Sequence, residues 1–165
     1  MIRLSKLTDY AIVIVTHMAA NFATQQVTAR VLAEQVGLGL PTVSKILKTL
    51  ARAGLLEAQR GKGGGYRLKR LPVDISVAEI IESMEGPLAL TDCSSDESAC
   101  CYIEDTCMVK DNWQKINVVV RDALGQLSLE SMTQPLHVPP HIHKNAGLKS
   151  GEEHTLVAIG RQNHG

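Results

Sequence analysis

The stretch VTARVLAEQVGLGLPTVSKILKTLARAGLL, residues 27–56, decides the fold. Its first part predicts a short helix that begins after Thr28, because a threonine hydroxyl at this position accepts a hydrogen bond from a free backbone N–H group of the first turn. The residues expected to face the core from this helix are Val31, Leu32 and Val36. Residues 37–40 then make a tight connection, and Pro41 is typical of the first turn of a second helix.

The second helix is expected to have two distinct faces. Its apolar residues recur at the spacing of one helix face: Val43, Ile46, Leu47 and Leu50. Its other face is polar and basic and carries Thr42, Ser44, Lys45 and Lys48. Two short helices joined by a glycine-containing turn are typical of a helix-turn-helix, whose second helix enters the major groove of DNA. We therefore expect these four polar residues to contact DNA.

A glycine-rich hairpin follows directly after these helices. The strand-like runs LLEAQR (55–60) and GYRLKR (65–70) flank the turn GKGG (61–64). A hairpin after a recognition helix is the wing of a winged helix, and Arg60 and Lys62 lie at its tip. We expect both residues to contact DNA, since the glycines beside them allow a close approach to phosphate. The predicted fold class is therefore mainly α with a small β wing.

The charge of the chain is divided between its two halves, although the formal net charge is zero. Residues 1–71 carry eleven Lys and Arg against three Asp and Glu, a net charge of +8. Residues 72–165 carry six Lys and Arg against fourteen Asp and Glu, a net charge of −8. A basic half suits a polyanionic partner. We therefore assign residues 1–71 to a winged helix-turn-helix domain that binds a double-stranded DNA operator.

The acidic half is expected to begin with a linker helix and a cysteine-rich loop, within a region that spans residues 72–134. Ser76 and Glu79 match the S-x-x-E pattern of a capping box, which predicts the start of the linker helix. The dipeptide Gly86-Pro87 is expected to end it. The loop that follows, residues 91–110, contains every cysteine of the chain.

A longer helix, residues 111–127, is expected after the loop, with Asp111 as its cap. Its apolar residues recur at helical spacing: Trp113, Ile116, Val119, Val120, Ala123, Leu124 and Leu127. A stripe of this width needs a partner. We expect the first helix (residues 12–18) to cover part of it and a second copy of the chain to cover the rest, so that residues 111–127 form the dimerisation helix of a homodimer.

The remaining residues, 135–165, are rich in Pro, Gly, His and polar side chains, and we expect a mostly disordered tail. His137, His141 and His143 belong to this tail. Their proline-separated spacing does not place them on one face of a regular element, which disfavours a metal site.

Several classes of protein are disfavoured. No apolar run approaches the length that spans a membrane, and the N-terminal segment lacks the small-residue cleavage site of a signal peptide. We therefore expect a cytoplasmic protein without a membrane partner. The chain also lacks a Walker-type phosphate loop, a dinucleotide fingerprint and a nucleophile elbow, so we do not expect an enzyme.

The four cysteines lie together in CSSDESACCYIEDTC, residues 93–107. In a reducing cytosol such a cluster favours metal or redox chemistry over a structural disulfide framework. Soft thiolates suit an iron–sulfur cluster. Zinc would accept them too, although the adjacent Cys100 and Cys101 cannot easily both reach one tetrahedral ion. A thiol–disulfide switch is the third alternative, disfavoured by neighbouring carboxylates that oppose formation of the reactive thiolate.

The chain resembles the Rrf2 family of winged-helix transcriptional regulators in a series of segments that occur in one order. These are RLSKLTDYA (3–11), LPTVSKILKTLARAGLL (40–56), RGKGGGYRL (60–68) and a C-x5-C pair followed by a tryptophan-bearing helix. The resemblance covers about residues 1–135 and extends to the branch that regulates SUF iron–sulfur cluster assembly. It implies a homodimeric repressor of iron–sulfur cluster assembly genes. It also implies a 4Fe-4S or 2Fe-2S cluster whose state sets the affinity for DNA; the alternative is a zinc- or thiol-based redox sensor without such a cluster.

The resemblance implies which thiolates bind the cluster. Cys101 and Cys107 match the family's C-x5-C pair, and Cys93 matches its first cysteine. The gap between Cys93 and Cys101 is two residues longer than is usual in the family. Cys100 is therefore the alternative ligand.

The resemblance also bears on the fourth ligand. In IscR-type members this ligand is a histidine at the position of Lys110, whose ammonium group has no free lone pair. In NsrR-type members it is an aspartate at the position of Asp9, contributed by the partner subunit. Asp9 is thus the implied fourth ligand, and Glu104, Asp105 and Cys100 are its competitors within the loop.

Overall fold

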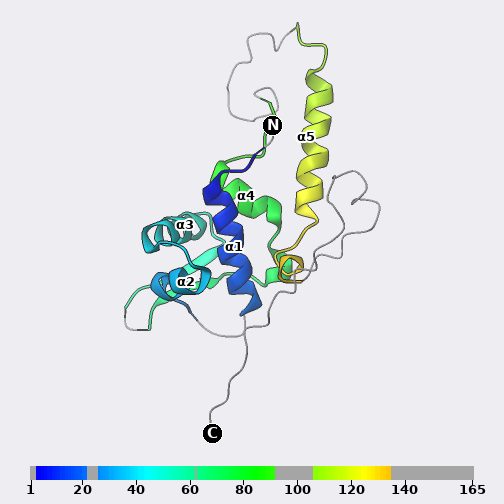
Figure 1. Ribbon diagram of the computed structural model, residues 1–165. Coiled ribbons are helices and arrows are strands. Elements are labelled where there is room, and N and C mark those ends of the chain that lie inside the picture. The colour runs from blue at the N-terminus through cyan, green and yellow to red at the C-terminus, as the bar shows by residue number, and fades with distance from the viewer. Residues whose placement is uncertain (1–2, 22–25, 62, 92–105, 135–165) are drawn as a thin grey trace, which may run out of the picture. The chain divides into compact units, whose positions relative to one another are not determined.

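The structure, a computed structural model, describes residues 3–21, 26–61, 63–91 and 106–134 of the 165 residues. In chain order its elements are α1 (Lys6–Ala20), α2 (Ala29–Val36), α3 (Leu40–Arg52), β1 (Leu56–Gln59), β2 (Gly65–Leu68), the 3₁₀ turn η1 (Pro72–Asp74), α4 (Val77–Glu85), α5 (Lys110–Gly125) and the 3₁₀ turn η4 (Ser131–Thr133) (Figure 1). The chain divides into two units, Met1–Pro135 and Leu136–Gly165. Every described residue belongs to the first unit, so the tail, with His137, His141 and His143, lies outside the described residues.

Helices α2 and α3 form the predicted helix-turn-helix. The Thr28 hydroxyl caps α2 by accepting a hydrogen bond from the backbone N–H of Val31 (3.3 Å). Gly37 ends α2 with a φ of 69°, a left-handed conformation that glycine adopts without a steric penalty. Helix α3 then begins with Pro41 in its first turn, as predicted.

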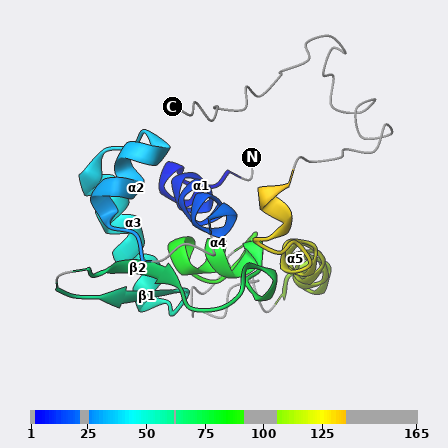
Figure 2. The ribbon, with the colours of Figure 1, turned by 90° about the horizontal axis from the view of Figure 1, so that it is seen from below.

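The predicted wing is a two-stranded antiparallel hairpin, in which Leu56 of β1 lies opposite Leu68 of β2 (Figure 2). A third segment joins it. The backbone N–H of Val27 donates to the carbonyl of Tyr66 (3.0 Å), and the N–H of Tyr66 donates to the carbonyl of Val27 (2.8 Å). Because Val27 directly precedes the cap of α2, this bridge ties the wing to the helix-turn-helix.

One hydrophobic core holds these elements together. The apolar face predicted for α3 is fully buried in it: Val43, Ile46, Leu47 and Leu50. The core also contains Ile14 of α1, Leu32 of α2 and Ile80 of α4. Leu129, which follows α5, is fully buried there as well, and its N–H donates to the carbonyl of Ile75 (2.7 Å). Residues from both sides of the predicted boundary at 71/72 therefore share this core.

Helices α4 and α5 lie against each other. Helix α4 begins with the predicted capping box of Ser76 and Glu79 and ends at Gly86. An ion pair between Glu82 of α4 and Arg121 of α5 joins the two helices (2.8 Å).

Helix α5 has no buried residue, although it is 16 residues long. Its apolar stripe is open to solvent in the single chain: Trp113 is 38% exposed, Ile116 45% and Val119 66%. In the described part of the chain its principal neighbour is α4, not α1, which was expected to cover part of the stripe.

Local expectations at two helices differ from the structure. Val31 was expected in the core but is 39% exposed, because the buried side of the two-turn helix α2 is formed by Leu32 and Ala33. The cap of α5 is Val109, and Asp111 lies in the first turn, where its carboxylate stabilises the positive end of the helix dipole. Since α5 ends at Gly125, Leu127 follows the helix and does not extend its stripe.

The described residues include no helix that is both long enough and apolar enough to cross a membrane.

Candidate nucleic-acid interface and metal-ligating residues

The free face of α3 carries the residues that were predicted to contact DNA. Lys45 and Lys48 are exposed, whereas Thr42 and Ser44 are partly buried. Neither lysine forms an ion pair with a carboxylate of the described residues. Their ammonium groups are therefore available to phosphate oxygens, and the hydroxyl groups near the N-terminal end of α3 are of the kind that reads base edges.

The tip of the wing presents one described cation, the exposed Arg60. Lys62, the second predicted contact at the tip, lies outside the described residues. Gly61 and Gly63 on either side of it have φ angles of 98° and 84°, which are strained for any residue with a side chain. At these two positions the backbone can therefore turn tightly, and no side chain would keep a DNA phosphate away from it.

Two further glycines of the wing are required by close packing. A Cβ atom at Gly64 would overlap the carbonyl oxygen of Gln59, and one at Gly65 would lie 2.7 Å from the carbonyl oxygen of Val27. Both positions are places where backbone approaches backbone. The sequence indicated a flexible, phosphate-approaching loop here and did not reveal this packing requirement.

Other basic residues of the +8 half are already paired. The guanidinium of Arg67 binds the carboxylate of Glu57 across the hairpin (2.6 Å), and that of Arg70 binds Glu79 (2.6 Å). Arg70 also donates to the carbonyl of Asp74 (2.9 Å). These arginines hold the wing and the start of α4 in place, so the charge count overstates the cations that are available to DNA.

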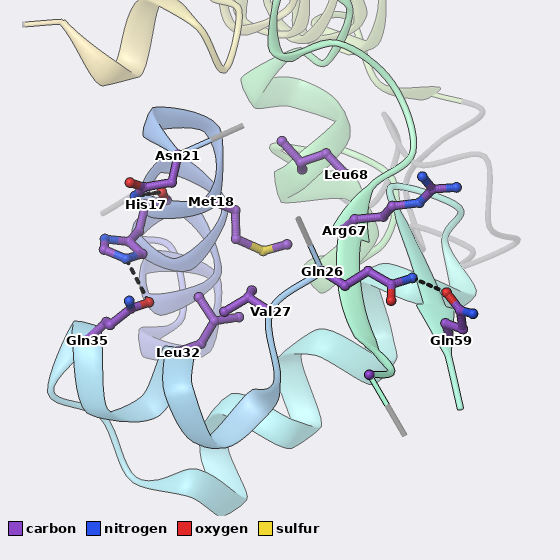
Figure 3. A pocket seen from close by; sticks show the side chains of 11 residues that line it. His17, Met18, Asn21, Gln26, Val27, Leu32, Gln35, Gln59, Arg67 and Leu68 are labelled. Atoms are coloured by element: carbon purple, nitrogen blue, oxygen red, sulfur yellow. Dashed lines mark hydrogen bonds between the residues drawn. The ribbon is translucent and has the colours of Figure 1, made fainter. Parts of the chain in front are cut away.

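A cavity of about 640 Å³ lies between α1, α2 and the wing (Figure 3). Its rim is polar: His17 bonds Gln35 (3.1 Å), and Gln26 donates to Gln59. Apolar side chains also line it, among them Met18, Leu32 and Leu68. Its described cation is Arg67, which Glu57 already neutralises. No described carboxylate or thiol lines it, so we assign it no chemical role.

The structure describes one of the four cysteines. Cys107 is a free thiol, half-buried, and its carbonyl accepts a hydrogen bond from the N–H of Lys110 at the start of α5 (3.4 Å). The other predicted ligands of the segment lie outside the described residues: Cys93, Cys100, Cys101, Glu104 and Asp105. Within the described ranges, no three His, Cys, Asp or Glu side chains come together as a metal site would require.

The chain that leads into the cysteine segment is fixed to α5. The side-chain amide of Asn117 donates to the carbonyl of Leu88 (2.8 Å), and its oxygen accepts from the N–H of Leu90 (3.1 Å). The described chain before the segment is therefore held by α5, and the described chain after it, from Thr106 and Cys107, leads into the beginning of the same helix. Asn117 was not among the predicted site residues.

Asp9, the predicted fourth ligand, is exposed in the first turn of α1. Next to it, Thr8 is fully buried, and its hydroxyl donates to Glu85, the last residue of α4. The N–H of Ser5 donates to the same carboxylate oxygen (2.9 Å). The Thr8 hydroxyl, followed by Ser5, holds the pKa of Glu85 below its usual value. The residue before Asp9 is thus held by the last residue of α4.

Glu85 and Asn117 were missed because each acts on a residue far away in the sequence. Glu85 lies eighty positions after Ser5, and Asn117 lies 29 after Leu88. Local patterns such as S-x-x-E report contacts within one turn only. The capping pattern at Ser5 could have suggested a missing carboxylate, but not its source.

A scan against protein families matches residues 4–135 to Rrf2, described as "Iron-dependent Transcriptional regulator". An HTH-type transcriptional regulator of Neisseria meningitidis serogroup A is 32% identical over 132 residues, which cover 80% of this chain and 88% of that protein. The HTH-type transcriptional regulator NsrR of Bacillus licheniformis is 25% identical over 130 residues, which cover 79% and 91%.

Solved structures show the same fold. IscR of T. potens has a TM-score of 0.60 at 27% identity, over 79% of this chain and 85% of that chain. CymR, the global cysteine regulator of B. subtilis, has a TM-score of 0.62 at 22% identity, over 81% and 97%.

Proposed function

The chain belongs to the Rrf2 family of transcriptional regulators, a family of regulators and not of enzymes, and on this basis we propose a specific function. It is a homodimeric repressor of iron–sulfur cluster assembly genes that acts in the cytoplasm. It senses through an iron–sulfur cluster held by the segment from Cys93 to Cys107.

Recognition of DNA is supported above all by the free face of α3. This face presents two lysines that pair with no carboxylate of the described residues, and two hydroxyl side chains, next to a wing whose tip carries Arg60. Lysines on such a face bind phosphate without regard to sequence, whereas hydroxyl groups near the N-terminal end of a recognition helix reach base edges. We assign operator contact to Thr42, Ser44, Lys45, Lys48, Arg60 and Lys62.

The donor set of the cysteine segment suits an iron–sulfur cluster. Cys93, Cys101 and Cys107 offer soft thiolates, and Cys107 is a free, half-buried thiol. Cys100 is the alternative to Cys101. A bound 4Fe-4S or 2Fe-2S cluster supplies a redox-sensitive group whose loss frees the thiolates that hold it. Leu88 and Leu90, which precede the segment, are held by Asn117 of α5, and Cys107 at the end of the segment lies just before that helix.

Asp9 from the partner subunit is the proposed fourth ligand. A carboxylate oxygen is a harder and more labile ligand for iron than a thiolate. The exposed position of Asp9 leaves its side chain accessible to a second chain. A ligand from the partner would make the cluster depend on the geometry of the dimer.

The uncovered face of α5 supports the homodimer. Helix α5 is 16 residues long and has no buried residue, and its apolar side chains Trp113, Ile116 and Val119 are exposed. An exposed apolar stripe of this kind is typical of a subunit interface. Dimers of helix-turn-helix proteins bind two half-sites that are one DNA turn apart.

Anaerobic purification followed by iron, acid-labile sulfide and zinc analysis and a visible absorption spectrum tests the sensing proposal. We expect iron and sulfide in matching amounts together with a visible chromophore. Stoichiometric zinc in a colourless protein, or a metal-free protein whose thiols oxidise reversibly, would instead support the zinc or thiol–disulfide sensor.

A further inference from the structure

The first turn of α1 is capped by a carboxylate that belongs to another helix. In an ordinary capping box, a Glu or Gln three residues after the cap returns to the N–H of the cap residue. In α1 that position is Thr8, whose hydroxyl is too short for this role. Glu85 fills the role from the end of α4, since it accepts from both the Ser5 N–H (2.9 Å) and the Thr8 hydroxyl. The capping box of α1 is thus divided between two helices.

The other capping box of the described chain is local. At the start of α4, Ser76 and Glu79 make both reciprocal hydrogen bonds within one turn. The hydrogen bonds of this box stabilise its own helix, although the Glu79 carboxylate also binds Arg70. The divided box also fixes the end of α4 to the start of α1. Its contact to Thr8 is partly shielded from water, because Thr8 is fully buried whereas Glu85 is exposed.

Along the chain, the divided box comes shortly before the cysteine segment. Glu85 is followed by Gly86, whose φ of 90° and ψ of −173° suit glycine alone. The chain then reaches Leu88 and Leu90, which bind Asn117 of α5. Only a few residues therefore separate Glu85 from the segment that carries the cysteines, and Glu85 acts on the residue adjacent to Asp9.

The divided box is also connected to the recognition helix. Helix α1 contributes Ile14 and Val15 to the core that buries the apolar face of α3. Well-packed cores transmit displacement because they have few voids to absorb it. We therefore expect a displacement of the first turn of α1 to displace α3 as well.

We propose that Glu85 is a positioning residue that couples the cysteine segment to the DNA-binding half. By holding Ser5 and Thr8, it fixes the first turn of α1, which carries Asp9, the ligand offered to the partner subunit, and it links that turn to the core that buries the apolar face of α3. This inference rests on the proposed function, since it assumes that the state of the segment controls affinity for DNA.

The test compares three variants of the full-length protein with the wild type: Glu85→Ala, Thr8→Val and the control Glu79→Ala. Thr8→Val keeps a buried β-branched side chain and removes the donor to Glu85. Glu79→Ala removes the carboxylate of the local capping box on the same helix, together with its ion pair to Arg70, and leaves the divided box intact. For each protein we would measure operator affinity with and without the cluster, and amide hydrogen exchange at Ser5 and Thr8 without the cluster.

The wild type and Glu79→Ala should keep a ratio between the two affinities of about fivefold or more, the lower end of typical allosteric coupling. In Glu85→Ala and in Thr8→Val the ratio should fall toward one, and in Glu85→Ala, which removes the acceptor of its N–H, Ser5 should lose protection from exchange. A double variant with both Glu85→Ala and Thr8→Val should be no worse than Glu85→Ala alone, because Glu85→Ala already removes the hydrogen bond that Thr8→Val removes.

Three outcomes count against the account. If the variants keep the wild-type ratio, or lose it no more than Glu79→Ala does, Glu85 is a structural cap and the inference is wrong while the proposed function stands. If Ser5 stays protected in Glu85→Ala, the divided box does not hold α1. If the wild type binds no cluster, or binds DNA equally with and without it, the proposed function fails and the inference falls with it.

Discussion

Lys45 and Lys48 differ from Arg67 and Arg70 in a property that residue type does not reveal. All four are basic residues of the DNA-binding half, but the two arginines already bind Glu57 and Glu79. The two lysines have no such partner among the described residues. An ion-paired cation releases few counterions when it meets phosphate, because its charge is already compensated. The free lysines are therefore the residues that should govern affinity.

Replacement of Lys45 or Lys48 by alanine should weaken binding to all duplexes alike, because each lysine neutralises a phosphate whatever the sequence. The slope of log affinity against log salt should fall by about one for each phosphate that is no longer neutralised. Fluorescence anisotropy over a series of salt concentrations measures this slope. Arg67→Ala is the control, and its effect on the slope should be smaller. A slope that responds to Arg67 and not to the lysines would contradict the assignment of the α3 face.

Alanine at Cys93, Cys101 or Cys107 should abolish the visible chromophore of anaerobically purified protein, because removal of a thiolate opens the cluster to solvent and oxygen. Cys100→Ala should largely retain it. Absorption spectra and iron counts of the four variants test this order. If Cys100 were essential and Cys101 dispensable, the register of the segment would differ from that of the family.

At the scale of elements, the wing is held by backbone. The bridge between Val27 and Tyr66 joins it to the helix-turn-helix, and Gly65 lets the two segments approach each other. The position of the wing relative to α3 therefore requires glycine at position 65 because a side chain there would clash. Backbone flexibility, the usual reason for glycines in a turn, is not the reason here.

Gly65→Ala should destabilise the protein by about 1–3 kcal/mol, the usual cost of forcing an extra methyl group into a packed site. It should also weaken DNA binding by displacing the wing. Gly125→Ala is the control, since a Cβ at the end of α5 meets nothing within 4 Å, and it should be neutral or stabilising by up to about 1 kcal/mol. Urea unfolding measures both. Equal stability of the two variants would show that the close approach at Gly65 is not required.

The exposed apolar stripe of α5 leads to a prediction about the homodimer. Val119→Glu should produce a folded monomer, because a buried, unpaired carboxylate is costly in an apolar interface. Val118→Glu makes the same change one residue away, outside the stripe, and should leave the dimer intact. Light scattering gives the mass and circular dichroism the helix content. If Val118→Glu separated the subunits and Val119→Glu did not, the interface would lie on another face of α5.

For the molecule as a whole, the sequence predicted what depends on neighbours along the chain. The apolar face of α3, the cap at Thr28 and the capping box of Ser76 and Glu79 are all patterns within a few residues, and all are present in the structure. The bridge from Val27 to Tyr66 and the contact from Glu85 to Thr8 join distant residues. Neither has a local signature, so neither could be predicted from one sequence.

The candidate site divides in the same way. The helix-turn-helix contacts follow from periodicity, and the cysteine ligands from spacing and family resemblance. The pairing of Arg67 and Arg70 required the fold, because Glu57 and Glu79 are identified as partners only when the hairpin and α4 are in place.

The central claim is that an iron–sulfur cluster in this chain sets its affinity for DNA. The most direct measurement is the affinity of one preparation for one duplex, recovered by in vitro selection, before and after anaerobic removal of the cluster at constant salt. We predict that the two dissociation constants differ by roughly 5- to 150-fold, the usual range of allosteric coupling, and that cluster reconstitution restores the first value. Equal dissociation constants in a preparation shown to contain iron and sulfide would contradict the claim.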